Sequence, residues 1–109
     1  AALEAVGVDA SGIVEAPEFL TGSSFMLGDL GGNQIAGFYP GASGVAADHA
    51  IAERARGARF GVVSATTLEA MRRHAEEIAG VGCELGFAPS QQVVAMPPDL
   101  IQEGLPLAS

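Results

Sequence analysis

The first long extended segment, residues 19–27, alternates side chains that are uncharged on both faces of a regular strand. The two faces are Thr21, Phe25 and Leu27 on one side and Gly22, Ser24 and Met26 on the other. Because neither face carries a charge, we expect both to be covered. Residues 29–32 then form a turn, in which two adjacent glycines can adopt positive φ. Residues 33–39 return as a second strand that Pro40-Gly41 ends, so the pattern predicts a β-hairpin.

After the hairpin the pattern becomes helical. Residues 45–56 are alanine-rich, with Glu53 and Arg56 spaced three apart, and Gly57 ends this helix. The short apolar run over residues 58–63 is typical of a buried strand.

A second helix begins at Thr66-Thr67-Leu68-Glu69, a capping box in which a threonine hydroxyl accepts from an N3 amide. Its apolar stripe is Leu68, Met71, Ala75 and Ile78, and its polar face is Glu69, Arg72, Arg73 and Glu76. Gly80 is the predicted C′ residue. Residues 83–87 form another short strand, and Pro97-Pro98-Asp99 open a last helix that Gly104 ends.

Two short apolar strands separated by a helix indicate a parallel crossover and therefore an α/β fold. The hairpin precedes this alternation and is predicted to be an appendage of the α/β core. The chain thus divides into the end of a helix and a linker over residues 1–18, a β-hairpin over 19–43 and a partial α/β core over 44–109.

Charge excludes several function classes. Thirteen acidic residues against five arginines and no lysine give a net charge of −8. No basic patch for nucleic acid or for an anionic membrane surface can be assembled from these residues. The absence of lysine excludes a Walker-type phosphate loop, a Schiff base and a lysine general base. The lone Cys83 is expected to be a small buried residue, and with no long apolar run we predict a soluble cytoplasmic protein.

Generic catalytic and metal motifs are missing from the sequence. His49 and His74 lie on separate predicted helices, without a partner at metal-ligand spacing. Ser23 and Ser24 lack a nucleophile elbow around them, and no G-x-G-x-x-G is present. Motifs alone therefore predict neither a catalytic residue nor a metal site.

Three stretches resemble one family in order and spacing. Residues 21–42, TGSSFMLGDLGGNQIAGFYPGA, resemble the lid hairpin of the ribokinase-like (PfkB) carbohydrate kinases, T-G-x-A-x-I-x-x-D-x-x-G-x-N-x-I followed by P-G-A. Residues 7–13, GVDASGI, are similar to the family's G-V-D-T-S-G-V, and residues 88–92, APSQQ, resemble D-P-S-Q-Q of its adenosine-kinase-like bacterial branch. The resemblance covers essentially the whole chain but only about the middle third of a family member.

The resemblance implies a fragment of a ribokinase-like fold, with a hairpin lid followed by parallel strand–helix units. It implies an ATP-dependent transfer of phosphate to a primary hydroxyl of a nucleoside or sugar, with Mg²⁺ as the metal of the parent family. The substrate-binding positions that it implies are Ser24, Met26, Phe38, Gln91 and Gln92. Phe38 suits stacking on a base, because an aromatic face packs on any purine.

Departures from the family pattern keep other functions open. The family's catalytic G-A-G-D and its acidic N-x-x-E element are missing, so this chain alone is expected to bind neither ATP nor Mg²⁺. Ala88 replaces the usual aspartate, and Ser43 replaces the asparagine or methionine found in relatives. Adenosine, ribose and fructose all remain candidate substrates. The alternative function is a non-catalytic fragment or a module that forms a homodimer through the lid, where a ribbon edge is a natural template for pairing.

Overall fold

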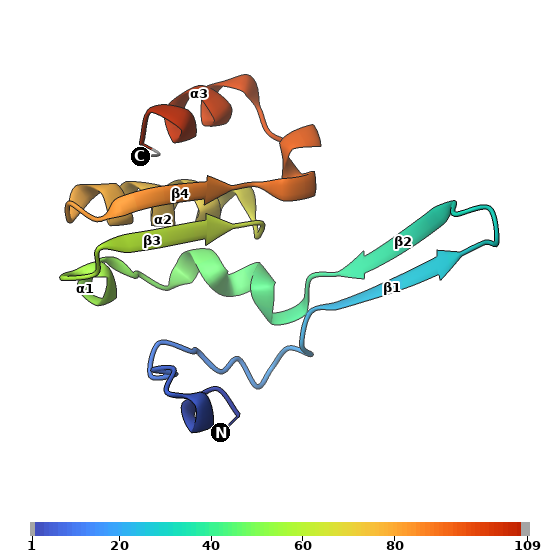
Figure 1. The fold of residues 1–109 in the computed structure, drawn as a ribbon, viewed down its shortest axis with the longest axis horizontal. Coiled ribbons are helices and arrows are strands. Elements are labelled where there is room, and N and C mark those ends of the chain that lie inside the picture. Colours follow the sequence, from blue (N-terminus) through green and yellow to red (C-terminus); the bar gives the residue numbers. More distant parts are fainter. Residues whose placement is uncertain (1, 108–109) are drawn as a thin grey trace.

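The computed structural model describes residues 2–107, and it describes side chains as far as Gln102. A two-stranded hairpin projects from a small α/β unit, as Figure 1 shows. The sequence-based prediction of an α/β fold with a hairpin appendage is confirmed. Along the chain the elements are η1 (Glu4–Val6), β1 (Ser23–Gly28), β2 (Gln34–Tyr39), η2 (Gly41–Asp48), α1 (Ala52–Ala55), β3 (Phe60–Ser64), α2 (Leu68–Gly80), β4 (Glu84–Ala88), η3 (Ser90–Val94) and α3 (Pro98–Leu107), where η denotes a 3₁₀ helix.

The hairpin pairs β1 with β2 in antiparallel register, with Ser24 opposite Phe38 and Leu27 opposite Ile35. Its first strand begins at Ser23 and not at residue 19 as the pattern predicted. The reason is that β2 ends at Tyr39, which pairs with Ser23, so the residues before Ser23 have no strand beside them.

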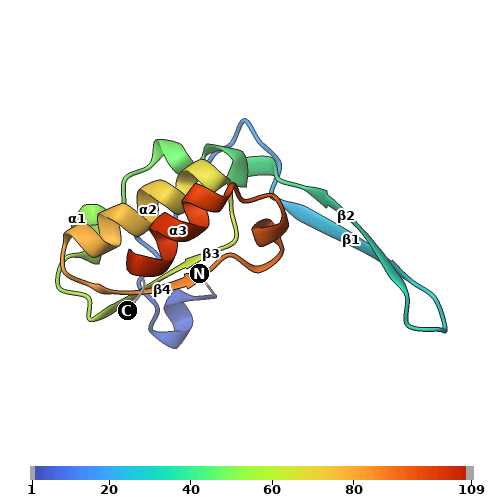
Figure 2. The same ribbon diagram turned by 90° about the horizontal axis from the view of Figure 1, so that it is seen from above.

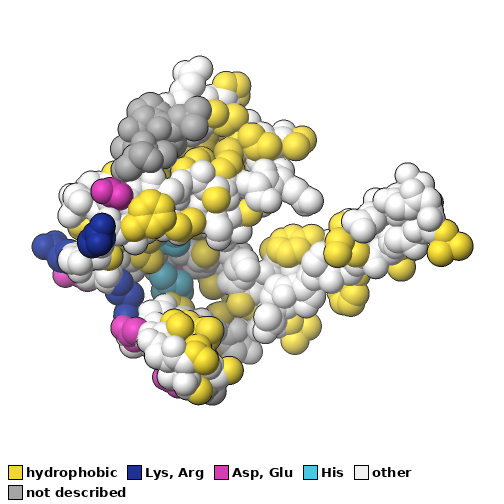
Figure 3. All heavy atoms as spheres, in the orientation of Figure 1, with side chains coloured by type: hydrophobic (Ala, Val, Ile, Leu, Met, Phe, Trp, Pro, Cys, Tyr) yellow, Lys and Arg dark blue, Asp and Glu magenta, His cyan; other side chains and the backbone are white. Residues whose placement is uncertain are grey.

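Both faces of the hairpin are exposed, contrary to our expectation that both would be covered. Phe25 on one face and Met26 on the other are 72% and 67% exposed. Figure 3 shows hydrophobic side chains spread along the projecting ribbon. The hairpin therefore offers apolar surface to whatever approaches it from either side.

The hairpin tip is closed by Asp29. Its carboxylate accepts the backbone N–H groups of Gly31 and Asn33 at 2.8 and 2.9 Å and the side-chain amide of Asn33 at 2.7 Å. The side-chain hydrogen bond from Asn33, with the backbone hydrogen bonds, lowers the pKa of Asp29 below its ordinary value. Gly32 has a φ of 83°, which only a residue tolerant of left-handed backbone adopts readily. Asp29 is thus a turn residue, as its position in the sequence indicated.

The α/β unit contains a parallel pair, β3 and β4, joined by α2. Figure 2 shows α2 and α3 on the same side of this sheet. The predicted apolar stripe of α2 is confirmed, because Met71, Ala75 and Ile78 are buried and Leu68 is half-buried against the core. The core also contains Val63, Cys83, Leu85, Met96 and Leu100.

Cys83 is buried with 6% of its surface exposed, as expected for a small apolar residue. A methyl group added to Gly61 would lie 3.1 Å from Ile78 and 3.5 Å from the Cys83 sulfur. Helix α2 therefore approaches β3 closely at Gly61, and the thiol lies in this close contact.

The caps of α2 lie later than the sequence suggested. The N-cap is Thr67 and not Thr66, and its hydroxyl accepts the N–H of Ala70 at 3.3 Å. Glu69 is then the second helical residue, so it is not at the N3 position that the predicted box requires. At the other end Gly80 is still helical, and the residue with positive φ is Gly82, at 77°.

The predicted helix over residues 45–56 is instead two short pieces, η2 and α1, separated by an extended residue at His49. The predicted ion pair between Arg56 and Glu53 is present at 3.0 Å. The last helix also differs from the prediction, since α3 continues past Gly104 to Leu107. The short helix η3 was not predicted.

The sheet face opposite α2 is open. Phe60 and Val62 are 56% and 58% exposed on this face, and Phe60 lies over Gly86, where an added methyl would approach its ring to 2.9 Å. Among the described residues, no helix is both long and apolar enough to cross a membrane.

Candidate functional site

A cavity of about 400 Å³ lies where the base of the hairpin meets the carboxyl ends of β3 and β4. Its lining comes from the end of β2 and the start of η2, from the β3–α2 loop and from the start of η3. The lining residues are Phe38, Pro40, Ser43, Ala65, Thr66, Thr67, Ser90, Gln91 and Gln92. Ligands of α/β proteins collect beyond the carboxyl ends of parallel strands, and the volume is within the range of small-molecule sites. This cavity is the candidate functional site.

Phe38 supplies the aromatic wall of the cavity. It is the residue before the last in β2 and lies directly opposite Ser24. Its exposed fraction is 67%. Ser24, Met26 and Phe38 share one face of the hairpin, because residues paired across the strands point to the same side. Of these three, Phe38 lines the cavity, whereas Ser24 and Met26 lie on the hairpin outside its lining.

Gln91 and Gln92 supply amide groups from the opposite side. Both belong to η3, which begins directly after β4 and Pro89. Among the described residues, neither side-chain amide has a hydrogen-bond partner, so both are available to a ligand. The structure thus brings three of the five predicted substrate residues, Phe38, Gln91 and Gln92, to one cavity.

Hydroxyl groups of the β3–α2 loop were missed by the sequence analysis. Thr66 and Thr67 line the cavity because β3 and β4 are neighbours and parallel, so their carboxyl ends open on the same space. The Thr67 oxygen already accepts from Ala70, which leaves its hydroxyl hydrogen free to donate. The two threonines follow the strand predicted over residues 58–63, so the rule that ligands collect beyond the carboxyl ends of parallel strands could have found them.

Among the described residues, no charged side chain lines the cavity, although the chain as a whole carries a net charge of −8. The polar lining consists of hydroxyl and primary amide groups, which both donate and accept. Among the described residues, no cluster of His, Cys, Asp or Glu could hold a metal ion. The arrangement suits an uncharged ligand with a flat apolar part and several polar edges.

Two glycines fix the base of the hairpin beside this cavity. Gly41 is buried with a φ of 51°, and a methyl group added there would overlap the carbonyl oxygen of Leu20. A methyl on Gly22 would lie 2.8 Å from the carbonyl oxygen of Pro40. The N–H of Ala42 donates to the Leu20 carbonyl at 2.9 Å. The strands leaving and entering the hairpin therefore cross in direct backbone contact.

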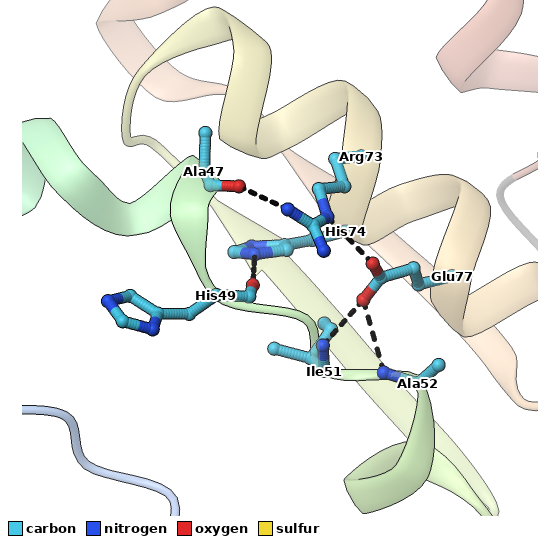
Figure 4. Close-up of polar contacts among 7 residues, drawn as sticks. All are labelled: Ala47, His49, Ile51, Ala52, Arg73, His74 and Glu77. Atoms are coloured by element: carbon cyan, nitrogen blue, oxygen red, sulfur yellow. Dashed lines mark hydrogen bonds and ion pairs between the residues drawn. The ribbon is translucent and has the colours of Figure 1, made fainter.

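The segment after the crossing is held by α2, as Figure 4 shows. Arg73 donates to the carbonyl of Ala47, and its Nε lies 2.8 Å from Glu77. Glu77 accepts the N–H groups of Ile51 and Ala52. We call these contacts, together with the one from His74 described next, the α2 clamp.

The second part of the α2 clamp is His74, whose Nε2 lies 3.0 Å from the carbonyl oxygen of His49. Because a carbonyl can only accept, this nitrogen carries the proton. The His74 ring therefore donates a hydrogen bond to the backbone carbonyl of His49 and holds the extended residue between η2 and α1.

Glu77 is the charged centre of the α2 clamp. Desolvation raises its pKa, but the hydrogen bonds from Arg73, Ile51 and Ala52 outweigh it and hold the pKa below its ordinary value. The carboxylate is thus ionised at neutral pH and ties α2 to the connection between η2 and α1.

No protein-family model matches the chain. No curated protein matches it at a significant level either. Solved structures do match, among them three of a nucleoside kinase from Burkholderia thailandensis. The inosine complex gives a TM-score of 0.88 at 24% identity, the ADP-inosine complex 0.84 at 24%, and the ligand-free form 0.77 at 25%.

Each of these matches covers 98% of the chain but only 33–36% of the kinase chain. The chain therefore spans about a third of the length of these proteins. The comparisons show that the chain has the fold of part of a nucleoside kinase, which agrees with the fold implied by the hairpin motif.

Proposed function

We propose that the chain is the substrate lid and part of the α/β core of an ATP-dependent kinase that phosphorylates the primary hydroxyl of a nucleoside. Within the ribokinase-like (PfkB) family we assign it to the adenosine-kinase-like branch, on the strength of the lid hairpin motif and of APSQQ at residues 88–92. The likeness in fold to a nucleoside kinase solved with inosine supports this proposal. We also propose a cytoplasmic location, in keeping with the unpaired thiol of Cys83.

The observation that carries the proposal is the cavity between the hairpin and the two strand ends. Phe38 presents an exposed ring on one side, and Gln91 and Gln92 present unpaired amides on the other. A nucleoside has the matching parts, because its base offers a flat π-face and its edges offer donors and acceptors. A simple sugar would use the amides and hydroxyls but would leave the aromatic wall without a stacking partner, so we favour a nucleoside over ribose or fructose.

The described residues do not fit the ATP and Mg²⁺ that the parent family uses. The adjacent glycines Gly31 and Gly32 lie in the hairpin tip, where Asp29 accepts the Gly31 N–H and no helix begins. No acidic cluster suited to a metal occurs in the described part of the chain. We therefore derive no step of phosphoryl transfer from these residues and assign them to substrate binding.

The direct test is a titration of the isotope-labelled chain with inosine, adenosine and ribose, followed by NMR. We expect saturable shifts of the Phe38 ring and of the Gln91 and Gln92 side-chain amides with both nucleosides. With ribose the Phe38 ring should not shift, because ribose has no base to stack on it. Shifts that are absent, or that scatter away from the cavity, would refute the binding role.

A second function, assembly of two copies through the hairpin, is favoured by a separate observation. The face of the hairpin turned away from Phe38 carries Phe25, Leu27 and Ile35, all at least 72% exposed. Leu27 and Ile35 are directly paired, so their side chains form one apolar patch. We propose that this patch is buried against a second copy.

Sedimentation velocity over a range of concentrations tests this assembly. The chain should form dimers, and the double substitution Leu27→Lys with Ile35→Lys should make it monomeric, since it places two charges in the patch. A parent chain that stays monomeric at all concentrations would rule out the assembly.

A further inference from the structure

Ser90 has an unusual backbone conformation. Its φ is 50°, and among the described residues it is the one residue other than glycine with positive φ. For an L-residue with a side chain this conformation costs free energy, because Cβ crowds the following carbonyl oxygen. Such conformations persist only where the surroundings impose them, and they gather at ligand sites. The position of Ser90 therefore needs an explanation.

No contact of the Ser90 side chain compensates for this cost. Within the part of the chain that the structure describes, its hydroxyl makes no hydrogen bond, and the residue is exposed. The residue before it, Pro89, has a φ of −68° and gives η3 no side-chain cap. Ser90 thus does not serve as a helix cap or as a core residue.

What the conformation does is change the direction of the chain. Strand β4 ends at Ala88, and η3 begins two residues later, at Ser90. The left-handed residue is the first of η3 and stands directly before Gln91 and Gln92. All three line the same cavity, together with Phe38 across from them. An extended Ser90 would carry the chain onward along β4 and take the glutamines away from Phe38.

We propose that Ser90 is a positioning residue for substrate binding, whose left-handed backbone holds Gln91 and Gln92 against the ligand opposite Phe38. The proposal rests on the proposed function, because it takes the cavity to be the nucleoside site. It assigns the role to the backbone conformation of Ser90 and not to its hydroxyl. It therefore predicts opposite outcomes for substitutions that permit this conformation and substitutions that oppose it.

The test uses two substitutions at Ser90. Ser90→Gly removes the hydroxyl but adopts positive φ freely, so inosine affinity should stay within about twofold of the parent. Ser90→Val is β-branched and resists this conformation, so inosine affinity should fall about tenfold or more. Affinities are measured by NMR titration of the whole chain, and thermal unfolding is recorded for every variant.

A matched control separates positioning from general destabilisation. Gly82, at the other end of β4, also has positive φ, at 77°, and a methyl added there would meet no atom within 4 Å. Gly82→Val should lower the unfolding temperature while leaving inosine affinity within about twofold of the parent, because it imposes strain away from the cavity.

A ligand-independent measurement keeps the two proposals distinguishable. In the free chain, nuclear Overhauser contacts between the Gln91 or Gln92 side-chain amide and other cavity residues should persist in Ser90→Gly and vanish in Ser90→Val. If no variant, nor the parent, binds inosine, the proposed function is wrong, and these contacts still decide whether Ser90 positions the glutamines. The positioning role is overturned if folded Ser90→Val keeps the contacts and the affinity, or if Ser90→Gly loses them.

Discussion

Phe38 and Phe25 are the same residue type on opposite faces of one hairpin, with 67% and 72% of their surfaces exposed. Only Phe38 lines the cavity. Since both rings are exposed, neither contributes much to the free energy of folding, and a difference between them in ligand binding must come from where each ring lies. The pair therefore offers a matched comparison.

Replacing Phe38 by alanine should weaken inosine binding by about 1–3 kcal/mol, the typical contribution of stacking one base on an aromatic side chain. Phe25→Ala should leave the dissociation constant unchanged. Both variants should unfold at nearly the same temperature as the parent. Titration calorimetry or NMR checks the affinities, and equal losses in the two variants would show that the hairpin as a whole, and not Phe38, is what matters.

Gly41 is a residue whose conformation and surroundings both demand glycine. Gly41→Ala should lower the free energy of unfolding by more than the roughly 1 kcal/mol that left-handed alanine costs, because the methyl also overlaps the Leu20 carbonyl. Gly32→Ala, with a φ of 83° and open space around it, should cost only the conformational part. Urea unfolding of the two variants measures the difference. Equal losses in the free energy of unfolding would mean that the backbone around Gly41 shifts enough to accommodate the methyl group.

At the scale of elements, α2 organises the α/β unit. Its apolar stripe covers β3 and β4, and its polar side residues Arg73, His74 and Glu77 hold the segment that follows the hairpin. One helix therefore connects the core to the chain that positions Phe38. Disturbing the α2 clamp should loosen the hairpin base without opening the core.

The carboxylate of Glu77 gives this connection a pH dependence. Its pKa is lower in the folded chain than in the unfolded one, so its stabilising effect is complete above the unfolded value of about 4.3 and is lost as pH falls through the folded value. Glu77→Gln should lower the free energy of unfolding at pH 7 by about 1–3 kcal/mol, since it removes hydrogen bonds to a charged group.

As pH falls through the folded-state pKa of Glu77, which lies below the ordinary value, the Glu77→Gln variant and the parent should converge in stability, because the parent carboxyl then becomes protonated as well. Glu76→Gln is the control, since Glu76 is exposed and no partner for it is found in the described part of the chain. Urea unfolding at several pH values measures the effect. A constant difference between Glu77→Gln and the parent across the whole pH range would contradict the role of the charge.

The sequence predicts best those helices and strands whose residue pattern is set by neighbours along the chain. The stripe of α2 and the alternation of the hairpin depend only on residue spacing, and both are present. The helix expected over residues 45–56 failed because its middle is held by distant groups: His74 takes the carbonyl of His49, and Glu77 takes the N–H of Ile51. Such tertiary hydrogen bonds override the helix propensity of alanine.

The candidate site was predictable only in part for the same reason. Phe38, Gln91 and Gln92 were found from the family resemblance, whereas Thr66 and Thr67 join them only through the pairing of β3 with β4. Ser90 carries no signal in the sequence, because serine is not a residue that marks positive φ. Whether these side chains bind a substrate stays a prediction.

At the scale of the molecule, apolar surface is exposed on two separate parts. One is the hairpin, and the other is the open sheet face with Phe60 and Val62. An α/β sheet is normally covered on both faces, and here the described helices α2 and α3 lie on one. The chain should therefore bind a hydrophobic dye and associate.

Substituting Phe60 and Val62 together by threonine should reduce the fluorescence of a bound hydrophobic dye. The unfolding temperature should change little, because both side chains are more than half exposed. Unchanged dye fluorescence would place the dye elsewhere, with the hairpin as the remaining candidate. A parent chain that binds no dye and unfolds sharply as a monomer would contradict the expectation itself.

The whole chain by itself should show no phosphotransferase activity. Phosphoryl transfer needs an anion hole, a base and a metal-organising acid placed together, and the described residues do not assemble them. Incubation with Mg²⁺-ATP and adenosine, and separately with ribose or fructose, followed by chromatography of the products, checks this. Turnover above a blank without protein, retained on repurification, would show that the catalytic residues lie within this chain.

The reactivity of the Cys83 thiol can report on the opening of the α/β unit. It is the single cysteine of the sequence, it is 6% exposed, and it lies between α2 and the sheet, far along the chain from the hairpin. Because the thiol is buried, we expect a thiol reagent to modify it slowly and to react faster when α2 moves away from β3. The rate of its modification thus measures the opening of the α/β unit and not of the hairpin. Comparing that rate with and without nucleoside would show how far binding in the cavity stabilises the α/β unit against opening.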